Sequence, residues 1–171
     1  QTSAGNEMSQ CLSVAMGSIE MSLSNNRMVA ETMARGVEAV QRQAVKGEQT
    51  ASDWDAAAYQ EILTSFVGSN PETFGGGIWF EPYQYRPEQR YFSPYCMRQN
   101  GAVTYVDNYS LGEGVYYTDQ DWYTNAANTT QKSVWSAPYN DEFAQISMVT
   151  SSAPIYDETG RFLGVATADI D

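Results

Sequence analysis

The chain has 171 residues, which fits one domain of ordinary size with a single hydrophobic core. It carries 21 acidic and 9 basic residues, and the resulting net charge of −12 disfavours contact with nucleic-acid phosphates. Histidine is absent, which excludes Ser-His-Asp and Cys-His catalytic groups and removes the commonest transition-metal ligand.

The two cysteines, Cys11 and Cys96, lie far apart in the sequence and match no zinc-type spacing. We expect two unpaired, buried thiols that act as small apolar residues, with a disulfide between them as the alternative.

The first 46 residues contain no proline, and their apolar residues recur at steps of three and four, which predicts a helix over 1–46. The residues of this apolar stripe are Met8, Leu12, Ala15, Ile19, Leu23, Ala30, Met33, Val37, Val40 and Ala44. The pattern lapses at 24–26, where we expect a bend or a polar register point. Such a helix would span roughly 69 Å, so part of it should project from the domain and find another partner. Two shorter helices folded onto the core are the alternative.

A second helix is predicted after a break at 47–50. Ser52 or Asp53 can cap its first turn, and its apolar residues continue from Trp54 to Phe66. Glycine and proline within 68–71 end it.

The chain beyond residue 71 has the composition of strands joined by short turns. Glycines 75–77 make room at the start of a strand that continues through 78–80. Further strands are predicted at 91–98, 102–107, 133–139, 146–156 and 161–170, and a short helix at 119–127. Short connections favour antiparallel pairing, so the predicted fold class is α+β, with helices packed against one antiparallel sheet.

Several sequence segments, in this order and spacing, resemble the extracytoplasmic Cache sensor domains of bacterial chemoreceptors and sensor histidine kinases. They are GGGIWFEP at 75–82, SPYCMRQNG at 93–101, WY at 122–123, VWSAPYND at 134–141 and MVTSSAPIYDETGRFLGVATADID at 148–171. The resemblance implies a PAS-like sheet preceded by a long helix. It also implies the membrane-distal module of a double Cache domain, with a single-module sensor as the alternative.

By the same resemblance, residues 1–46 form a helix for signalling and dimerisation, and residues 47–171 form the ligand-binding module. The implied protein is the periplasmic portion of a membrane-anchored receptor, with a small-molecule ligand and a homodimer contact through the long helix. We expect no enzymatic activity, no cofactor and no nucleic-acid partner.

Amino-acid-binding members of the family carry an arginine two positions before the Trp-Tyr pair, where it holds the ligand carboxylate. This sequence has Gln120 there, which lacks the charged, bidentate guanidinium. The family's downstream aspartate, which binds the ligand amino group, matches Asp169, and Asp141 is a second candidate.

Residues 116–123 concentrate four aromatic side chains and two carboxylates, a set that can hold a cation against ring faces. We therefore predict a small amine or quaternary ammonium ligand. The candidate ligand-binding residues are Trp79, Tyr117, Asp121, Trp122, Tyr123, Tyr139, Asp141 and Asp169.

Packing in the core is the alternative role for several aromatic residues. Trp122 and Tyr123 can pack the short helix onto the sheet, while Trp135 and Tyr139, four apart in a predicted strand, can share one core-facing side. Asp169 lies in an apolar strand and must face solvent, a partner or a ligand.

Other ligands and roles also stay open. An inward-facing Lys132 or Arg98 would favour an organic acid or an amino acid as ligand. Paired carboxylates alone, such as Asp119 and Asp121, do not make a hydrolase. The alternative function is a passive interaction module whose pocket is filled by its own aromatic side chains.

Overall fold

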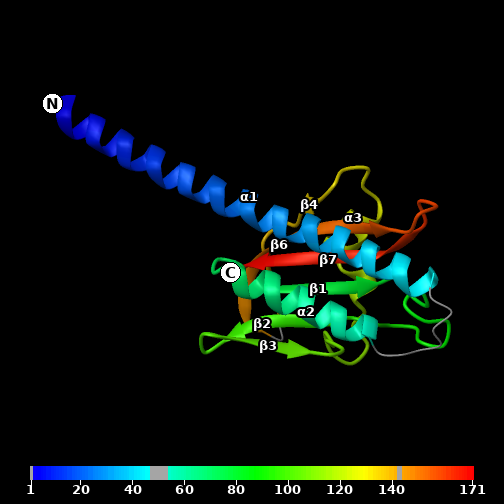
Figure 1. Ribbon diagram of the computed structural model, residues 1–171. Helices are drawn as coiled ribbons and strands as arrows, with labels where there is room; N and C mark the ends of the chain where they lie inside the picture. Colours follow the sequence, from blue (N-terminus) through cyan, green and yellow to red (C-terminus); the bar gives the residue numbers. More distant parts are fainter. Residues whose placement is uncertain (1, 47–53, 142–143) are drawn as a thin grey trace.

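A computed structural model describes residues 2–46, 54–141 and 144–171 (Figure 1). Two helices come first, α1 (Thr2–Lys46) and α2 (Trp54–Ser69), and the remaining elements build a sheet with a small helical cap. These elements are β1 (Gly75–Phe80), β2 (Tyr95–Gln99), β3 (Ala102–Val106), η1 (Tyr117–Asp119), α3 (Asp121–Ala127), β4 (Val134–Trp135), β5 (Tyr139–Asp141), β6 (Ile146–Tyr156) and β7 (Phe162–Ile170).

The strands form one antiparallel sheet in the order β3-β2-β1-β7-β6-β4, with β5 paired to β6. Helices α1 and α2 cover one face, and α3 lies over the other (Figure 1). Both faces of β7 are therefore buried, which explains its nearly continuous apolar sequence. The predicted α+β, PAS-like fold is confirmed.

Helix α1 is continuous through residues 24–26, where the sequence pattern allowed for a bend. Its residues 3–21 are exposed, and Asn26 is the first buried residue along the helix. The apolar stripe therefore has two environments. Its later members, such as Met33 and Val37, are fully buried against the sheet, whereas Leu12 and Ile19 are at least 60% exposed where the helix projects (Figure 1). The predicted break at 47–50 and the caps Ser52 and Asp53 lie outside the described residues.

Three predicted boundaries were wrong. The strand expected at 133–139 is interrupted before Tyr139 by Pro138, which cannot donate to a strand ladder, so Trp135 and Tyr139 lie in separate strands, β4 and β5. The strand expected from residue 91 begins after Pro94. The helix expected from residue 119 begins at Asp121, because the preceding turn is the 3-10 turn η1.

Both cysteines are unpaired thiols, but only one is buried. Cys96 belongs to β2 and faces α2, where its Sγ lies 3.3 Å from the Leu63 carbonyl oxygen. Cys11 is exposed, because it falls on the projecting part of α1; the expectation that it would be buried was wrong.

Candidate functional site

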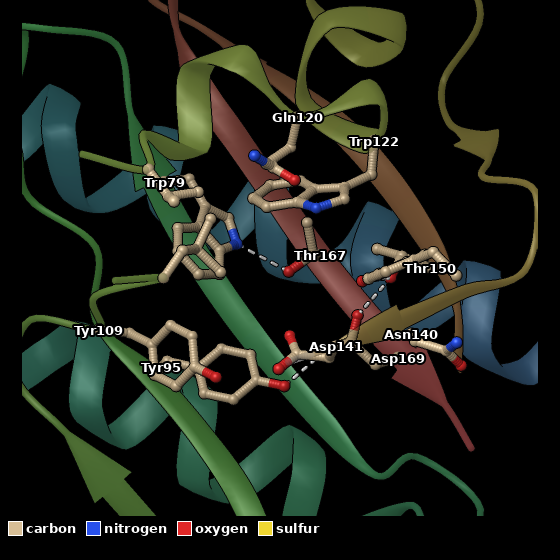
Figure 2. Close-up of a pocket in the computed structure, with 13 residues that line it drawn as sticks. Trp79, Tyr95, Tyr109, Gln120, Trp122, Asn140, Asp141, Thr150, Thr167 and Asp169 are labelled. Carbon is tan, nitrogen blue, oxygen red and sulfur yellow. Dashed lines mark hydrogen bonds between the residues drawn. The ribbon is translucent and has the colours of Figure 1, made fainter. Parts of the chain in front are cut away.

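A cavity of about 230 Å³ lies between the sheet and the segment that contains η1 and α3 (Figure 2). Strands β1, β2, β5, β6 and β7 contribute to its walls. Its lining residues are Trp79, Tyr95, Tyr109, Leu111, Val115, Gln120, Trp122, Tyr139, Asn140, Asp141, Thr150, Thr167 and Asp169. Val115 and Asn140 are exposed to solvent as well, so they mark the mouth of the cavity.

Strand alternation brings Asp169 to this cavity. In β7, Ala166 and Ala168 face the helices α1 and α2, so Thr167 and Asp169 face the opposite side. Asp169 is only 3% exposed. A carboxylate at this depth requires polar partners.

Two hydroxyl groups hold the Asp169 carboxyl group. Tyr95 Oη donates to Asp169 Oδ2 at 2.6 Å, and Thr150 Oγ1 donates to Asp169 Oδ1 at 2.7 Å (Figure 2). The Tyr139 hydroxyl lies 2.6 Å from Thr150 Oγ1. Because the Thr150 proton is engaged with Asp169, Tyr139 is the donor in that pair. A carboxylate has about four acceptor positions, so Asp169 keeps capacity for a further donor.

Burial raises the pKa of Asp169 to about 6, against the lowering effect of the hydrogen bonds from Tyr95 and Thr150. The nearby charge of Asp141 raises this pKa further. Burial, and then the Asp169 charge, also raise the pKa of Tyr95 well above its usual value. Tyr95 therefore stays a proton donor to Asp169 across the ordinary pH range.

Asp141 brings a second carboxyl group to the cavity from β5. Its Oδ1 accepts a hydrogen bond from the backbone N–H of Ala144 at 2.8 Å, which fixes the end of the strand. Figure 2 shows the side chains of Asp141, Asp169 and Tyr95 together on one side of the cavity, opposite Trp122 and Gln120. The two carboxyl groups make this side of the cavity acidic, and the charge of Asp141 raises the cost of ionising Asp169.

Aromatic rings form much of the remaining wall. The ring centroids of Trp79 and Trp122 lie 4.8 Å apart, and Trp79 Nε1 donates to Thr167 Oγ1 at 2.8 Å. Gly77 permits this packing, because a Cβ there would lie less than 3.0 Å from the Trp79 indole. A Cβ at Gly75 would likewise lie less than 3.0 Å from the Tyr95 side chain. These glycines lie inside β1 and make room for the aromatic wall.

No lysine or arginine belongs to the described lining of the cavity. Arg98 instead binds the backbone carbonyls of Val67, Asn70 and Thr73, where it satisfies the end of α2. Lys132 is exposed. Neither predicted alternative cation therefore reaches the cavity.

Five of the eight candidate residues predicted from sequence line the cavity: Trp79, Trp122, Tyr139, Asp141 and Asp169. The other three, Tyr117, Asp121 and Tyr123, lie elsewhere. The Tyr117 hydroxyl donates to the Phe80 carbonyl oxygen at 2.5 Å, behind Trp79, and the Tyr123 hydroxyl donates to Glu81. Asp121 is exposed on a neighbouring depression.

The sequence prediction missed Tyr95, Tyr109 and Thr150 among the polar lining residues. Thr150 lies directly opposite Asp169 in the β6·β7 ladder, and Tyr95 lies opposite Gly77 in the β1·β2 ladder. These placements depend on strand register. For Thr150 the sequence did hold a signal, because the short turn at 157–160 pairs β6 with β7 and so limits which β6 residues can lie opposite Asp169. The other missed residues are Leu111, Val115, Asn140 and Thr167.

Comparison with protein families identifies the family of this domain. A profile described as "Methyl-accepting chemotaxis protein-like, first PDC sensor domain" matches residues 59–171, which include every cavity-lining residue. The chain belongs to this PDC sensor family. The Cache-type resemblance seen in the sequence is therefore confirmed. A comparison with curated protein sequences finds no match.

Solved sensor domains have the same fold. The extracellular domain of mmHK1S-Z3, assigned to the histidine kinases, is 22% identical with a TM-score of 0.69 over 96% of this chain. The Campylobacter jejuni chemoreceptor Tlp3, solved with L-valine, is 16% identical with a TM-score of 0.67 over 96%. The Pseudomonas aeruginosa PAO1 amino acid chemoreceptor PctC, solved with GABA, is 17% identical with a TM-score of 0.56 over 96%.

This PDC domain spans 59%, 58% and 60% of the length of those three solved chains, respectively. The first of these matches is an extracellular domain, and the other two are ligand-binding domains of chemoreceptors; none of the three is a catalytic domain. Within the described residues, no helix has the length and apolar character needed to cross a membrane.

Proposed function

We propose that this PDC domain is the sensor of a membrane receptor and that its cavity binds a small amine or quaternary ammonium ion. One observation carries the proposal: Asp141 and Asp169 face one cavity whose described lining contains no basic side chain. A ligand cation would balance the two carboxyl groups and stabilise the ionised form of Asp169.

The walls of the cavity suit such a cation. An ammonium group near the two carboxylates gains charge-assisted hydrogen bonds, and the rings of Trp79, Trp122 and Tyr95 offer faces or edges to its alkyl part. Cation–π contact contributes about 0.5–2 kcal/mol for each favourable ring. A quaternary ammonium would use the rings and the charges but could not donate hydrogen bonds.

The cavity volume limits the ligand to a small solute. A dry cavity of about 150 Å³ accommodates benzene, with six heavy atoms, so about 230 Å³ corresponds to about nine heavy atoms by proportion. This size favours monoamines and short amino compounds.

An amino acid is the second candidate, favoured by the L-valine complex of Tlp3. Its ammonium group would use Asp169 in the same way. Its carboxylate would meet the neutral amides of Gln120 and Asn140, which form weaker hydrogen bonds than a guanidinium does. The alternative of a pocket closed by its own aromatic rings receives no support, because the cavity is open.

In the proposed mechanism the domain lies outside the cytoplasmic membrane and binds its ligand without chemical conversion. Ligand binding favours one of two arrangements of β7 and α1 and passes this preference to membrane spans. The shift is limited by the difference in ligand affinity between the two arrangements.

A thermal-shift screen with matched pairs tests the proposal. Each pair contains an amine and the amino acid that yields it on loss of its carboxylate, for example isobutylamine with valine, and organic acids serve as a third class. A ligand at 100 times its dissociation constant stabilises by about 2.7 kcal/mol, which raises the melting temperature by roughly 5–11 °C. We expect the amine of a pair to stabilise more than its amino acid. Stabilisation by organic acids alone would contradict the proposal.

A further inference from the structure

A second depression lies next to the cavity and shares part of its wall. It has a volume of about 320 Å³, and its lining includes Asp119, Asp121 and the loop 136–138. Four residues line both spaces: Gln120, Trp122, Tyr139 and Asn140. A ligand that passes these four side chains would extend from the inner cavity into the outer depression.

The outer depression repeats the chemistry of the inner cavity. Asp119 and Asp121 bring two carboxyl groups, and neither side chain forms a hydrogen bond or ion pair with a described residue. Both are exposed, so their charge remains available to a solute. No basic side chain occurs in its described lining.

Two of the four shared residues, Trp122 and Tyr139, are aromatic and lie at the boundary between the two acidic spaces. Trp122, which is 6% exposed, and Tyr139, which is half-buried, each line both spaces. Methylene groups pack well against such rings, whereas a charged group at this position would lose hydration. From the inner cavity to the outer depression, the lining therefore offers two carboxyl groups, then aromatic rings, then two further carboxyl groups.

We infer that the preferred ligand is a linear diamine, with one ammonium group at Asp141 and Asp169, an alkyl chain along Trp122 and Tyr139, and the second ammonium group at Asp119 and Asp121. This inference rests on the proposed amine function and specifies the ligand class of the same site. Because the outer carboxylates are exposed, the second ammonium group contributes a moderate gain, about fivefold in affinity.

Calorimetric titration of a diamine series tests the inference. Diaminoalkanes with three to eight carbons are compared with monoamines of equal heavy-atom count, such as 1,4-diaminobutane with n-pentylamine. We expect tighter binding of the diamine and a maximum at one chain length, because both pairs of carboxylates have fixed positions. The double variant Asp119→Asn/Asp121→Asn should remove the diamine advantage and leave the monoamine affinity within about twofold.

A matched control removes two charges elsewhere. Glu61 and Glu72 are exposed, and neither lines either of the two spaces, so Glu61→Gln/Glu72→Gln should keep the diamine advantage. Thermal melting of each variant confirms that it folds. Equal affinity for diamines and monoamines, or a diamine advantage that persists in the Asp119→Asn/Asp121→Asn variant, would overturn the inference and leave amine binding intact. Failure of every amine to bind would overturn the proposed function as well.

Discussion

Asn26 Nδ2 in α1 donates a 2.8 Å hydrogen bond to the carbonyl oxygen of Ala168, the residue that precedes Asp169 in β7. The Thr73 hydroxyl donates to Asn26 Oδ1 at 2.9 Å, so both ends of the buried amide are engaged. This amide attaches α1 to the strand that carries the cavity carboxylate, at the point where the helix leaves the sheet. It is the polar register point expected near residues 24–26.

We predict that Asn26→Ala destabilises the domain by about 1–3 kcal/mol, because it leaves the Ala168 carbonyl and the Thr73 hydroxyl buried without this partner. Asn25→Ala is the matched control, since Asn25 is exposed and should change stability by less than about 0.5 kcal/mol. Urea unfolding of both variants provides the comparison. Equal effects at the two positions would show that the buried amide has no special role.

Asp169 predicts a pH dependence of stability. The pKa of Asp169 is about 6 in the folded domain, mainly because of burial, and about 3.9 in an unfolded chain. The folded state therefore retains a proton that the unfolded state releases, and the stability that Asp169 contributes is present below about pH 4 and is lost as pH rises through 6. Asp169→Asn does not titrate, so it should gain at most about 2–3 kcal/mol relative to wild type between pH 4 and 7.

Unfolding free energies of wild type and Asp169→Asn, measured at half-unit steps from pH 4 to 7.5, check this prediction. A difference that stays constant across the range would mean that Asp169 has an ordinary pKa in the folded domain.

Amine binding should weaken in acid, because Asp169 becomes protonated as the pH falls below its pKa of about 6. A cation binds best to the ionised form of Asp169, so affinity should be about tenfold lower at pH 5 than at pH 7.5. Tetramethylammonium keeps its charge at every pH and therefore assigns the effect to the protein. Calorimetry at the two pH values measures it, and an affinity that does not change would exclude Asp169 as the cation partner.

Gln120 provides a test of charge at the wall opposite Asp141 and Asp169. Gln120→Arg introduces a cation that competes for the same carboxylates, so amine affinity should fall by about tenfold or more while affinity for an amino acid rises. Gln120→Met is the control of similar size without charge. If Gln120→Met and Gln120→Arg weaken amine binding equally, the amide itself contributes and the charge does not.

Dimerisation through α1 stays a prediction that sedimentation can test. Leu12 and Ile19 belong to the exposed part of the apolar stripe, whereas Val14 lies on the opposite face, about 200° away from Leu12 at 100° per residue. Leu12→Glu/Ile19→Glu should shift a dimer to monomer, and Val14→Glu should not. Monomeric wild-type protein at high concentration would contradict a dimer contact through α1.

The local pattern of the sequence predicted the long helix and marked Asp169 as a carboxylate that needs solvent, a partner or a ligand, and the family resemblance assigned Asp169 to the ligand site. The stripe that includes Met33 and Val37 has helical spacing, and Asp169 is the only charged residue in β7, which is otherwise largely apolar. A carboxylate in such a strand requires a partner, and the structure supplies Tyr95 and Thr150. The prediction could not name these partners, because they depend on how four strands, β2, β1, β7 and β6, align.

Residue direction limited the rest of the site prediction. Tyr117 and Tyr123 are near Trp122 in sequence, but the turn η1 and the helix α3 rotate each side chain to a different side. Tyr117 therefore anchors the Phe80 backbone, and Tyr123 reaches Glu81. Proline-interrupted pairing likewise separated Trp135 from Tyr139.

Calorimetric titration of isobutylamine into wild type and Asp169→Asn at pH 7.5 tests the central claim most directly. We predict saturable one-to-one binding to wild type and at least about tenfold weaker binding to the variant, with thermal melting to confirm that the variant is folded. Equal binding to both proteins, or binding of isobutyric acid in place of the amine, would contradict a cation site at Asp169.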